Sequence, residues 1–315
     1  MSLIGTHVAV AGGLVKSGLA EASEVGAEII QLFGGNPRSW VQRAPDPAGD
    51  DAFRAACADR GLPVVVHAPH LINLGSPSDV VLNRSLTGLE TTLQRAAAIG
   101  ATAVVVHAGA LVVKGRRPTV LAGLHDVLAP IVDRAEVRLL IEPTAGAGEA
   151  MASTVESTIE LMVALNDERI GLCLDTCHLH AAGEDLAEPG KLVNRITDAV
   201  GPQSIGLIHV NDSRDPIGSH RDRHESLGSG TLDPSAFEAL LKVPALQDVP
   251  MLVETPTHNS DVAILKSLRS KSADHEATTK HPVADGRPRR SGQSVPRRLQ
   301  ACTPRLGKPR PRRTG

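Results

Sequence analysis

The sequence is poor in aromatic residues and cysteine and has no long apolar run. Among 315 residues there are three Phe, one Trp and no Tyr, so the core must be aliphatic and few side chains can stack on nucleic-acid bases. Four cysteines are too few for a disulfide scaffold and favour a reducing cytoplasm. No stretch reaches the ~18 uncharged apolar residues of a membrane-spanning helix, and the first residues lack the basic start of a signal peptide. These absences exclude a membrane protein and an extracellular disulfide-rich domain.

The charge of the chain is divided unevenly between a body and a tail. Residues 271–315 hold 12 Lys and Arg against 3 Asp and Glu, whereas residues 1–270 hold 21 basic and 32 acidic residues. The tail also has six prolines and no hydrophobic periodicity, which predicts a disordered segment at 270–315 after a folded domain at 1–269. Two roles stay open for this segment: an arm that binds phosphate groups, or an inert, solubilising extension.

Short aliphatic runs alternate with amphipathic helical patterns along residues 1–269. The runs lie at 4–11, 28–33, 63–68, 103–108, 137–144, 170–177, 205–211 and 250–255, and the helical patterns at 14–26, 52–60, 79–99, 118–134, 153–166, 185–200, 234–241 and 261–270. Continuous apolar strands predict a parallel sheet, and eight strand–helix units predict an α/β fold of the (β/α)8 TIM-barrel class. A doubly wound sheet is the alternative, but no Gly-x-Gly-x-x-Gly turn follows the first run.

The predicted strands end in residues that can bind metal ions. Strand ends supply His67, His107, Glu142, Asp175, His209 and Glu254, while His178 follows the sixth strand and Asp222 and His224 follow the seventh. In a barrel these ends meet at one rim, where active sites are built. A single histidine or carboxylate there is an ordinary structural residue. Nine together indicate a metal centre, because unpaired carboxylates would repel one another and divalent cations remove that repulsion.

The chemistry of these residues limits the metal and the reaction. Five imidazoles and four carboxylates suit Zn²⁺, with Mn²⁺ or Fe²⁺ as substitutes. Nine ligands exceed one site, so two or three ions are needed. Three zinc ions would bring the net charge of residues 1–270 from −11 to about −5 and make the rim positive, which allows an anionic substrate. Clustered metal ions are the usual arrangement for phosphodiester hydrolysis.

Several motifs resemble those of the endonuclease IV family of apurinic/apyrimidinic endonucleases. They are NPRSW at 36–40, HAPHLINL at 67–74, EPTAG at 142–146, IGLCLDTCH at 170–178, HVNDS at 209–213 and DRHESLGSG at 222–230. They occur in order and at suitable spacing, and the similarity extends from about residue 4 to about residue 268.

The resemblance implies a (β/α)8 barrel with three zinc ions. One ion would bind His67, His107 and Glu142; a second would share Glu142 and add Asp175, His209 and Glu254; the third would bind His178, Asp222 and His224. The implied reaction is hydrolysis of double-stranded DNA on the 5′ side of abasic sites, leaving a 3′-hydroxyl and a 5′-deoxyribose phosphate, with removal of blocking groups from 3′ ends. Glu142 or Glu254 would orient or deprotonate the nucleophile. The resemblance further implies a cytoplasmic, bacterial-type enzyme that acts at the nucleoid, with no membrane partner.

Three residues match positions that fill the gap left by a flipped abasic nucleotide in the family. They are Arg38 after the second strand and His70 and Leu71 after the third. The family has a Tyr where this chain has His70. A histidine can stack, but it offers less area and gains charge near pH 6.5, which predicts weaker or pH-dependent recognition of damage. Closure of the strand edges within the barrel predicts a monomer.

Two other functions fit parts of this pattern. A metal-dependent sugar isomerase or epimerase on a similar barrel also has Glu, Asp and His at strand ends. Such enzymes generally need one or two metal ions, so the additional Asp222 and His224 and the Arg38 loop favour the nuclease. A nucleic-acid-binding protein that has lost catalysis is disfavoured by the complete ligand set.

Overall fold

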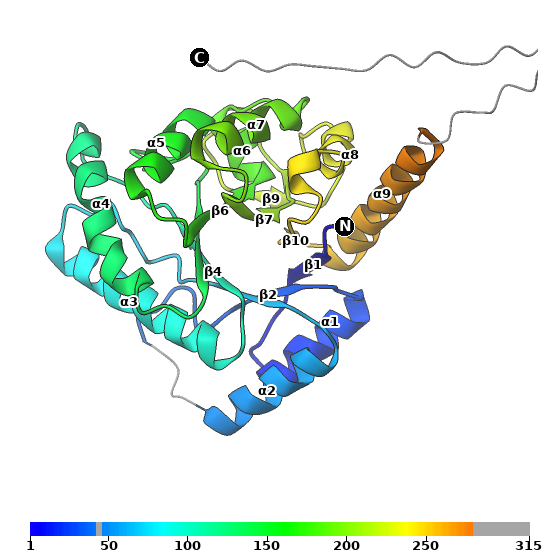
Figure 1. The fold of residues 1–315 in the computed structure, drawn as a ribbon, viewed down its shortest axis with the longest axis horizontal. Helices are drawn as coiled ribbons and strands as arrows, with labels where there is room; N and C mark the ends of the chain where they lie inside the picture. Colours follow the sequence, from blue (N-terminus) through cyan, green and yellow to red (C-terminus); the bar gives the residue numbers. More distant parts are fainter. Residues whose placement is uncertain (42–45, 280–315) are drawn as a thin grey trace, which may run out of the picture.

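A closed barrel of parallel strands forms the centre of the protein. The computed structural model describes residues 1–41 and 46–279. Within them, eight strands follow the order β1-β10-β7-β6-β5-β4-β3-β2 around the barrel, and Figure 1 shows the helices arranged around them. The strands are β1 (Ile4–His7), β2 (Ile30–Phe33), β3 (Val64–His67), β4 (Ala103–His107), β5 (Arg138–Glu142), β6 (Ile170–Asp175), β7 (Ile205–His209) and β10 (Met251–Val253). The predicted (β/α)8 barrel is confirmed.

Helices follow the strands in the expected alternation. They are α1 (Leu19–Val25) after the π-helical turn η1 (Leu14–Gly18), α2 (Pro47–Asp59), α3 (Asp79–Ala98), α4 (Arg117–Val132), α5 (Val155–Leu165), α6 (Thr176–Ala182), α7 (Pro189–Val200), α8 (Ser235–Leu241), the 3-10 turn η2 (Pro244–Leu246) and α9 (His258–Thr279). None of the described helices combines the length and apolarity needed to cross a membrane.

Side-chain caps determine where several helices begin. Thr154 and Ser157 form a capping box at the start of α5. At the end of β6, Oδ1 of Asp175 accepts a hydrogen bond from the backbone N of His178 at 3.0 Å. This cap starts α6 directly after the strand. The strand therefore ends at Asp175, whereas the apolar pattern predicts a strand up to Cys177.

Aliphatic side chains fill the barrel, as the scarcity of aromatic residues predicts. The inner cluster consists of buried residues from all around the barrel: Ile29, Val65, Ala103, Val105, Leu140, Cys173, Leu207 and Leu252. A larger cluster packs between the strands and the helices and includes the fully buried Phe53 of α2. Burial of each large side chain contributes roughly 1.5–3 kcal/mol. This packing fixes the strands, and thereby the positions of the residues at their ends.

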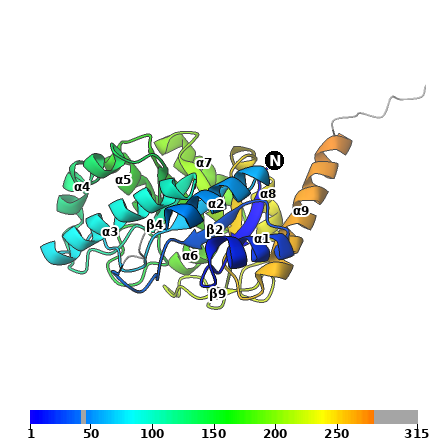
Figure 2. The ribbon, with the colours of Figure 1, turned by 90° about the horizontal axis from the view of Figure 1, so that it is seen from below.

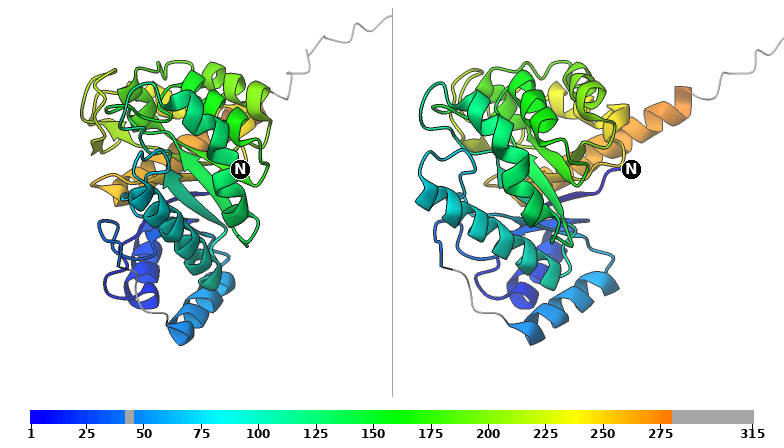
Figure 3. Two further views of the ribbon diagram at one scale, coloured as in Figure 1. Left: turned by 90° about the vertical axis from the view of Figure 1, so that its left-hand side faces the viewer. Right: turned by 60° about the vertical axis from the view of Figure 1, so that its left-hand side comes forward.

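Helix α9 is joined to the start of the chain through Arg269. The guanidinium of Arg269 donates to Ser2 O at 2.7 Å and to Glu28 Oε2 at 2.6 Å. Figures 2 and 3 show that α9 projects beyond the other helices. The helix continues to Thr279, past the boundary predicted at 269, so residues 270–279 are helical where the composition predicts disorder. The rest of the predicted tail, 280–315, lies outside the described residues.

Candidate metal centre

The carboxyl ends of the strands bring the predicted ligands to one rim. Five of the ligands are the last residues of their strands: His67, His107, Glu142, Asp175 and His209. Glu254 directly follows β10, and His178 lies in the first turn of α6. Asp222 and His224 come from the segment that follows β7, where β8 (Asp212–Ser213) pairs with β9 (His224–Glu225) in an antiparallel hairpin. Contacts of 3.8 Å or less connect all nine side chains.

Glu142 lies at the centre of this network and is 1% exposed. Its Oε2 is 3.2 Å from Nε2 of His67 and 3.4 Å from Nε2 of His107. Its Oε1 is 3.0 Å from Nδ1 of His209 and 3.3 Å from Nδ1 of His178. Each carboxylate oxygen thus faces a different pair of imidazoles. A carboxylate in this position can bridge two metal ions.

His209 belongs to a second group of ligands on the opposite side of Glu142. Nδ1 of His209 is 3.3 Å from Oε2 of Glu254 and 3.8 Å from Oδ2 of Asp175. Asp175 and His209 are buried, and the Glu254 side chain is 16% exposed. Two carboxylates and an imidazole therefore face the same small volume as Oε1 of Glu142.

A third group lies nearer the surface and contains two nitrogen atoms without a hydrogen-bond partner. Nε2 of His178 and Nε2 of His224 are buried atoms with no such partner among the described residues, although they lie 3.1 and 3.2 Å from Oδ1 of Asp222. In His178, Nδ1 donates to Pro143 O at 3.0 Å, which leaves the lone pair of Nε2 directed toward Asp222. Buried nitrogens without partners are costly unless another group binds them. A divalent cation between the three side chains would bind both, so these residues fit the implied metal.

The charges of the cluster shift the pKa values of its members. Burial alone would raise the pKa of Glu142, but the charges of His209 and His107 outweigh it and hold that pKa well below its usual range. Burial alone would lower the pKa of His224, but Asp175 and Asp222 raise it to about 9. The carboxylates of the rim therefore attract positive charge strongly, which is the electrostatic condition for binding divalent cations.

Two buried amides support the predicted ligands and were not singled out from the sequence. Gln31 of β2 and Asn211 after β7 are both 0% exposed. Oε1 of Gln31 accepts from Nε2 of His209 at 2.9 Å, and Nδ2 of Asn211 donates to Oδ2 of Asp175 at 2.7 Å. Such outer contacts orient metal ligands. Gln31 could have been found from the sequence, because it is an amide inside an otherwise apolar strand. A buried polar side chain needs hydrogen-bond partners, so such a residue is expected to contact other polar groups.

The three predicted DNA-contacting residues lie on two adjoining loops of the same rim. Arg38 is exposed in the loop after β2, and His70 and Leu71 lie in the loop after β3. The backbone N of His70 donates to Pro37 O at 3.1 Å, which joins the two loops. The structure therefore joins the two loops that carry this set, beside the predicted metal ligands.

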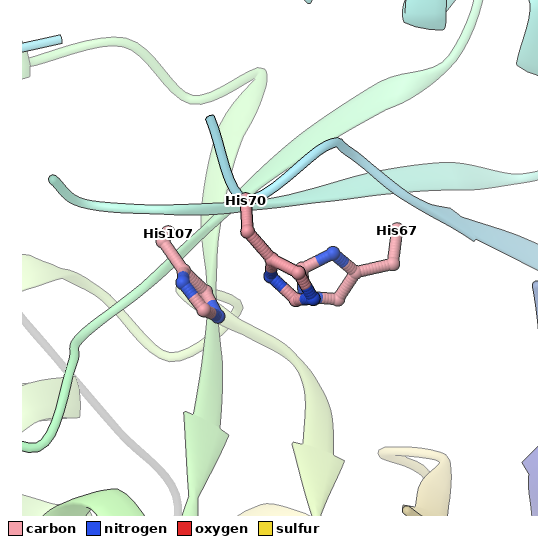
Figure 4. A group of neighbouring side chains, drawn as sticks. All are labelled: His67, His70 and His107. Carbon is pink, nitrogen blue, oxygen red and sulfur yellow. The ribbon is translucent and has the colours of Figure 1, made fainter. Parts of the chain in front are cut away.

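The imidazole of His70 is turned toward the rim. Its ring centroid is 5.3 Å from that of His67 and 5.2 Å from those of His107 and Phe33, and Figure 4 shows the three histidine rings gathered together. Loss of water around the ring, followed by the charges of His67 and His107, lowers the pKa of His70 to about 4. His70 thus stays neutral above pH 5, and the change of charge near pH 6.5 that was expected from an ordinary histidine is not supported.

Comparison with known proteins relates this chain to one family. The family model described as a xylose isomerase-like TIM barrel matches residues 19–278. The chain is 42% identical over 278 residues to the probable endonuclease 4 of Streptomyces avermitilis, an alignment that covers 84% of this chain and 90% of that protein. It is 40% identical over 266 residues to the probable endonuclease 4 of Mycobacterium tuberculosis, with 84% and 98% covered.

Solved structures show the same likeness. The crystal structure of endonuclease IV from Thermus thermophilus superposes with a TM-score of 0.74 at 34% sequence identity, covering 87% of this chain and 99% of that chain. A D-tagatose 3-epimerase-like protein superposes with a TM-score of 0.68 at 18% identity, over 89% of this chain and 100% of that chain, which shows a shared fold alone. The relatives at 34–42% identity, together with the family model, show that the chain belongs to the endonuclease IV family of xylose isomerase-like TIM barrels.

Proposed function

We propose that this protein is a DNA repair endonuclease that hydrolyses the phosphodiester bond 5′ to abasic sites in double-stranded DNA. The products are a 3′-hydroxyl and a 5′-deoxyribose phosphate, and the same site removes blocking groups from 3′ ends. One observation carries the proposal: Glu142 and eight further side chains that could bind metal ions gather on one rim of the barrel. Endonuclease 4 relatives with up to 42% identity support the same reaction class.

We propose that the nine side chains form sites for three Zn²⁺ ions, with Mn²⁺ or Fe²⁺ as possible substitutes. The first ion would be held by His67, His107 and Oε2 of Glu142. The second would be held by Oε1 of Glu142 with Asp175, His209 and Glu254, and the third by His178, Asp222 and His224. The shared oxygens of Glu142 and the two unpartnered nitrogens of the third group support this division.

The two candidate catalytic carboxylates differ in their surroundings. When bound, zinc ions activate the nucleophile and neutralise charge on the phosphate and the leaving oxygen. Both oxygens of Glu142 face imidazoles, so this residue serves best as a bridging ligand. Glu254 keeps 16% exposure, and its Oε1 accepts from Nε2 of Gln31 at 2.6 Å. We assign to Glu254 the orientation and deprotonation of the attacking nucleophile.

Recognition of damage would use the loops after β2 and β3. An abasic nucleotide lacks stacking and is cheaper to flip out of the duplex than a paired one. The exposed Arg38 and the half-buried Leu71 lie on loops joined by the His70–Pro37 hydrogen bond, so both can enter the gap that is left in the stack. His70, the third residue of the predicted DNA-contacting set, has its ring beside His67 and His107 of the rim.

The oligomeric state, the location and the role of the basic segment are proposed from this reaction. We propose that the enzyme works as a monomer on nucleoid DNA in the cytoplasm. The closed order of the barrel strands leaves no strand edge within the barrel for pairing with another chain, which supports the monomer. We assign catalysis to the barrel together with α9. The basic residues of the segment 280–315 would add affinity for DNA.

A sugar isomerase or epimerase is the alternative, and one feature separates the two functions. The hairpin after β7 carries Asp222 and His224 onto the rim, where they form a third ligand group with His178. A proton transfer between sugar carbons needs no such group, whereas a phosphodiester has a leaving oxygen whose charge a third ion can neutralise.

A nicking assay tests the proposal directly. Duplex DNA with one central abasic-site analogue would be incubated with the wild-type protein, with His107→Ala and with His125→Ala, a histidine of α4 outside the rim that serves as the matched control. An intact duplex would be run in parallel, and metal content would be measured on each preparation. We expect about three zinc ions per wild-type chain and cleavage only 5′ of the lesion, lost in His107→Ala alone. A fully metal-loaded wild-type protein without cleavage would contradict the proposal, and sugar substrates would be tested next.

A further inference from the structure

His70 stands where two of the predicted metal ligands converge. One nitrogen from each of His67, His70 and His107 can be chosen so that the three lie within 4.8 Å of one another. The His67 and His107 rings are themselves 5.1 Å apart and nearly perpendicular, and His70 lies 5.2–5.3 Å from both. Figure 4 shows that the three side chains come from separate points of the rim and turn their rings toward one another.

The carboxylate of Glu142 completes this group. Nε2 of His67 and Nε2 of His107 both approach Oε2 of Glu142, at 3.2 and 3.4 Å. Nδ1 of His67 bonds to Ala68 O at 2.7 Å, which leaves Nε2 as the nitrogen that faces Glu142. Two imidazoles and one carboxylate oxygen therefore meet at the place of the first ion, and a nitrogen of His70 lies close to the nitrogens of both imidazoles.

The position of His70 is held by groups outside the metal centre. Its backbone N donates a hydrogen bond to Pro37 O, and its ring forms a T-shaped pair with Phe33, with the ring centroids 5.2 Å apart. Within the described part of the chain no hydrogen bond to the His70 ring is found, so both ring nitrogens are free to bind another group. Packing therefore holds the ring at the rim, and its two nitrogens make no hydrogen bond with the described residues.

We propose that His70 is a fourth protein ligand of the metal ion bound by His67, His107 and Glu142. The inference rests on the proposed function only for the presence of that ion. Zinc prefers four ligands in a tetrahedron with Zn–N distances of ~2.0–2.1 Å. Three imidazoles and one carboxylate oxygen would supply four such ligands. The first ion would then be held more tightly than by three ligands, and filling the gap in damaged DNA would fall to Arg38 and Leu71.

The test follows metal retention in the full-length, metal-loaded protein. His70→Ala would be compared with wild type and with Leu71→Ala, the neighbouring residue of the same loop, in competition with a zinc chelator. We expect His70→Ala to lose one ion at least roughly tenfold more readily than wild type and Leu71→Ala to retain its ions. Because His70 is exposed, its replacement should leave the fold intact, which circular dichroism would check.

A second variant gives a positive signal that a structural role would not produce. In cobalt-loaded protein, His70→Cys should add a thiolate-to-cobalt charge-transfer band that the wild type lacks. Unchanged metal retention in His70→Ala would overturn the proposal, and the band in His70→Cys would support it. Nicking of abasic DNA by the wild type is measured separately, so a protein that binds metal through His70 without cleaving DNA would refute the proposed function and not this inference.

Discussion

Gln31 fixes the orientation in which His209 faces Glu142. Oε1 of Gln31 accepts a hydrogen bond from Nε2 of His209 at 2.9 Å, while Nδ1 of the same ring lies 3.0 Å from Oε1 of Glu142. The amide group of Gln31 also donates to Glu254 at 2.6 Å. One buried side chain of β2 thus contacts two predicted ligands of the second ion: His209 at the end of β7 and Glu254 directly after β10.

Replacement of Gln31 by Leu should weaken metal binding without removing a ligand. The change leaves the buried N–H of His209 without an acceptor and frees the ring to rotate. Loss of such an outer contact typically costs 10- to 100-fold in metal affinity or activity, so we expect a decrease of that order in both. Chelator competition and nicking rates would measure it, with Gln94→Leu on the exposed face of α3 as the control. Equal metal retention in the two variants would contradict this role.

Replacement of Asp222 by Asn should remove one metal ion and leave the others bound. Asp222 contacts only His178 and His224 among the predicted ligands, and its side chain is 48% exposed. We therefore expect about one ion fewer per chain and little change in thermal stability. Nicking should fall roughly 10²-fold or more, because an ion at the leaving oxygen contributes several kcal/mol. Asp198→Asn on α7 is the matched control. Loss of all ions in Asp222→Asn would show that the three groups do not bind independently.

Strand ends were the part of the structure that the sequence predicted best. Most residues of the barrel strands are apolar and buried, so a terminal His67, Glu142 or His209 stands out from its own strand. Since parallel strands in a barrel all end at one rim, the order of these residues along the chain predicts that they meet in space. Both steps depend on local pattern and on one topological rule, which is why they succeed.

Contacts between distant strands were not predictable in the same way. Gln31 and His209 are 178 residues apart in the sequence, and no sequence pattern links the two positions. Their hydrogen bond could therefore not be predicted. The short helix α6 depends on one cap, made by Asp175, whose other carboxylate oxygen lies 3.5 Å from Nε2 of the predicted ligand His224. The extension of α9 past residue 269 follows from helix growth beyond a tertiary anchor at Arg269, where composition alone predicts disorder. Tertiary contacts decide the first and third of these cases, whereas a local cap decides the second.

The ion pair of Glu28 with Arg269 should make stability depend on pH in the acid range. The Arg269 hydrogen bonds lower the pKa of Glu28 from 4.5 to about 2, helped by the backbone N of Ile4 and by Lys266. A carboxylate with a lowered pKa stabilises the fold above its unfolded value and loses that contribution as pH falls toward the folded value. Glu28→Gln should therefore destabilise the protein at pH 7, by about 1–2 kcal/mol after allowance for solvent screening.

Urea unfolding of wild type and Glu28→Gln at several pH values would check this prediction. The difference in unfolding free energy should be constant above pH 5 and should shrink as pH falls from 4.5 toward 2. Glu24→Gln on α1, an exposed carboxylate, is the control. A difference that persists at the lowest pH at which both proteins fold would show that Glu28 acts through packing and not through its charge.

Removal of residues 280–315 should change how DNA binding responds to salt. This segment holds eleven basic residues and one acidic residue, and every phosphate contact it makes adds about 0.9 to the slope of log K against log salt concentration. The truncated chain keeps the Arg269 anchor of α9, so we expect normal folding and normal cleavage at low salt. Its affinity for intact duplex should fall at low salt and depend less steeply on salt. A full-length variant with Arg289, Arg290, Arg312 and Arg313 changed to Gln separates charge from length, because it should lose part of the slope while keeping the segment. An unchanged slope in both proteins would identify the segment as an inert extension.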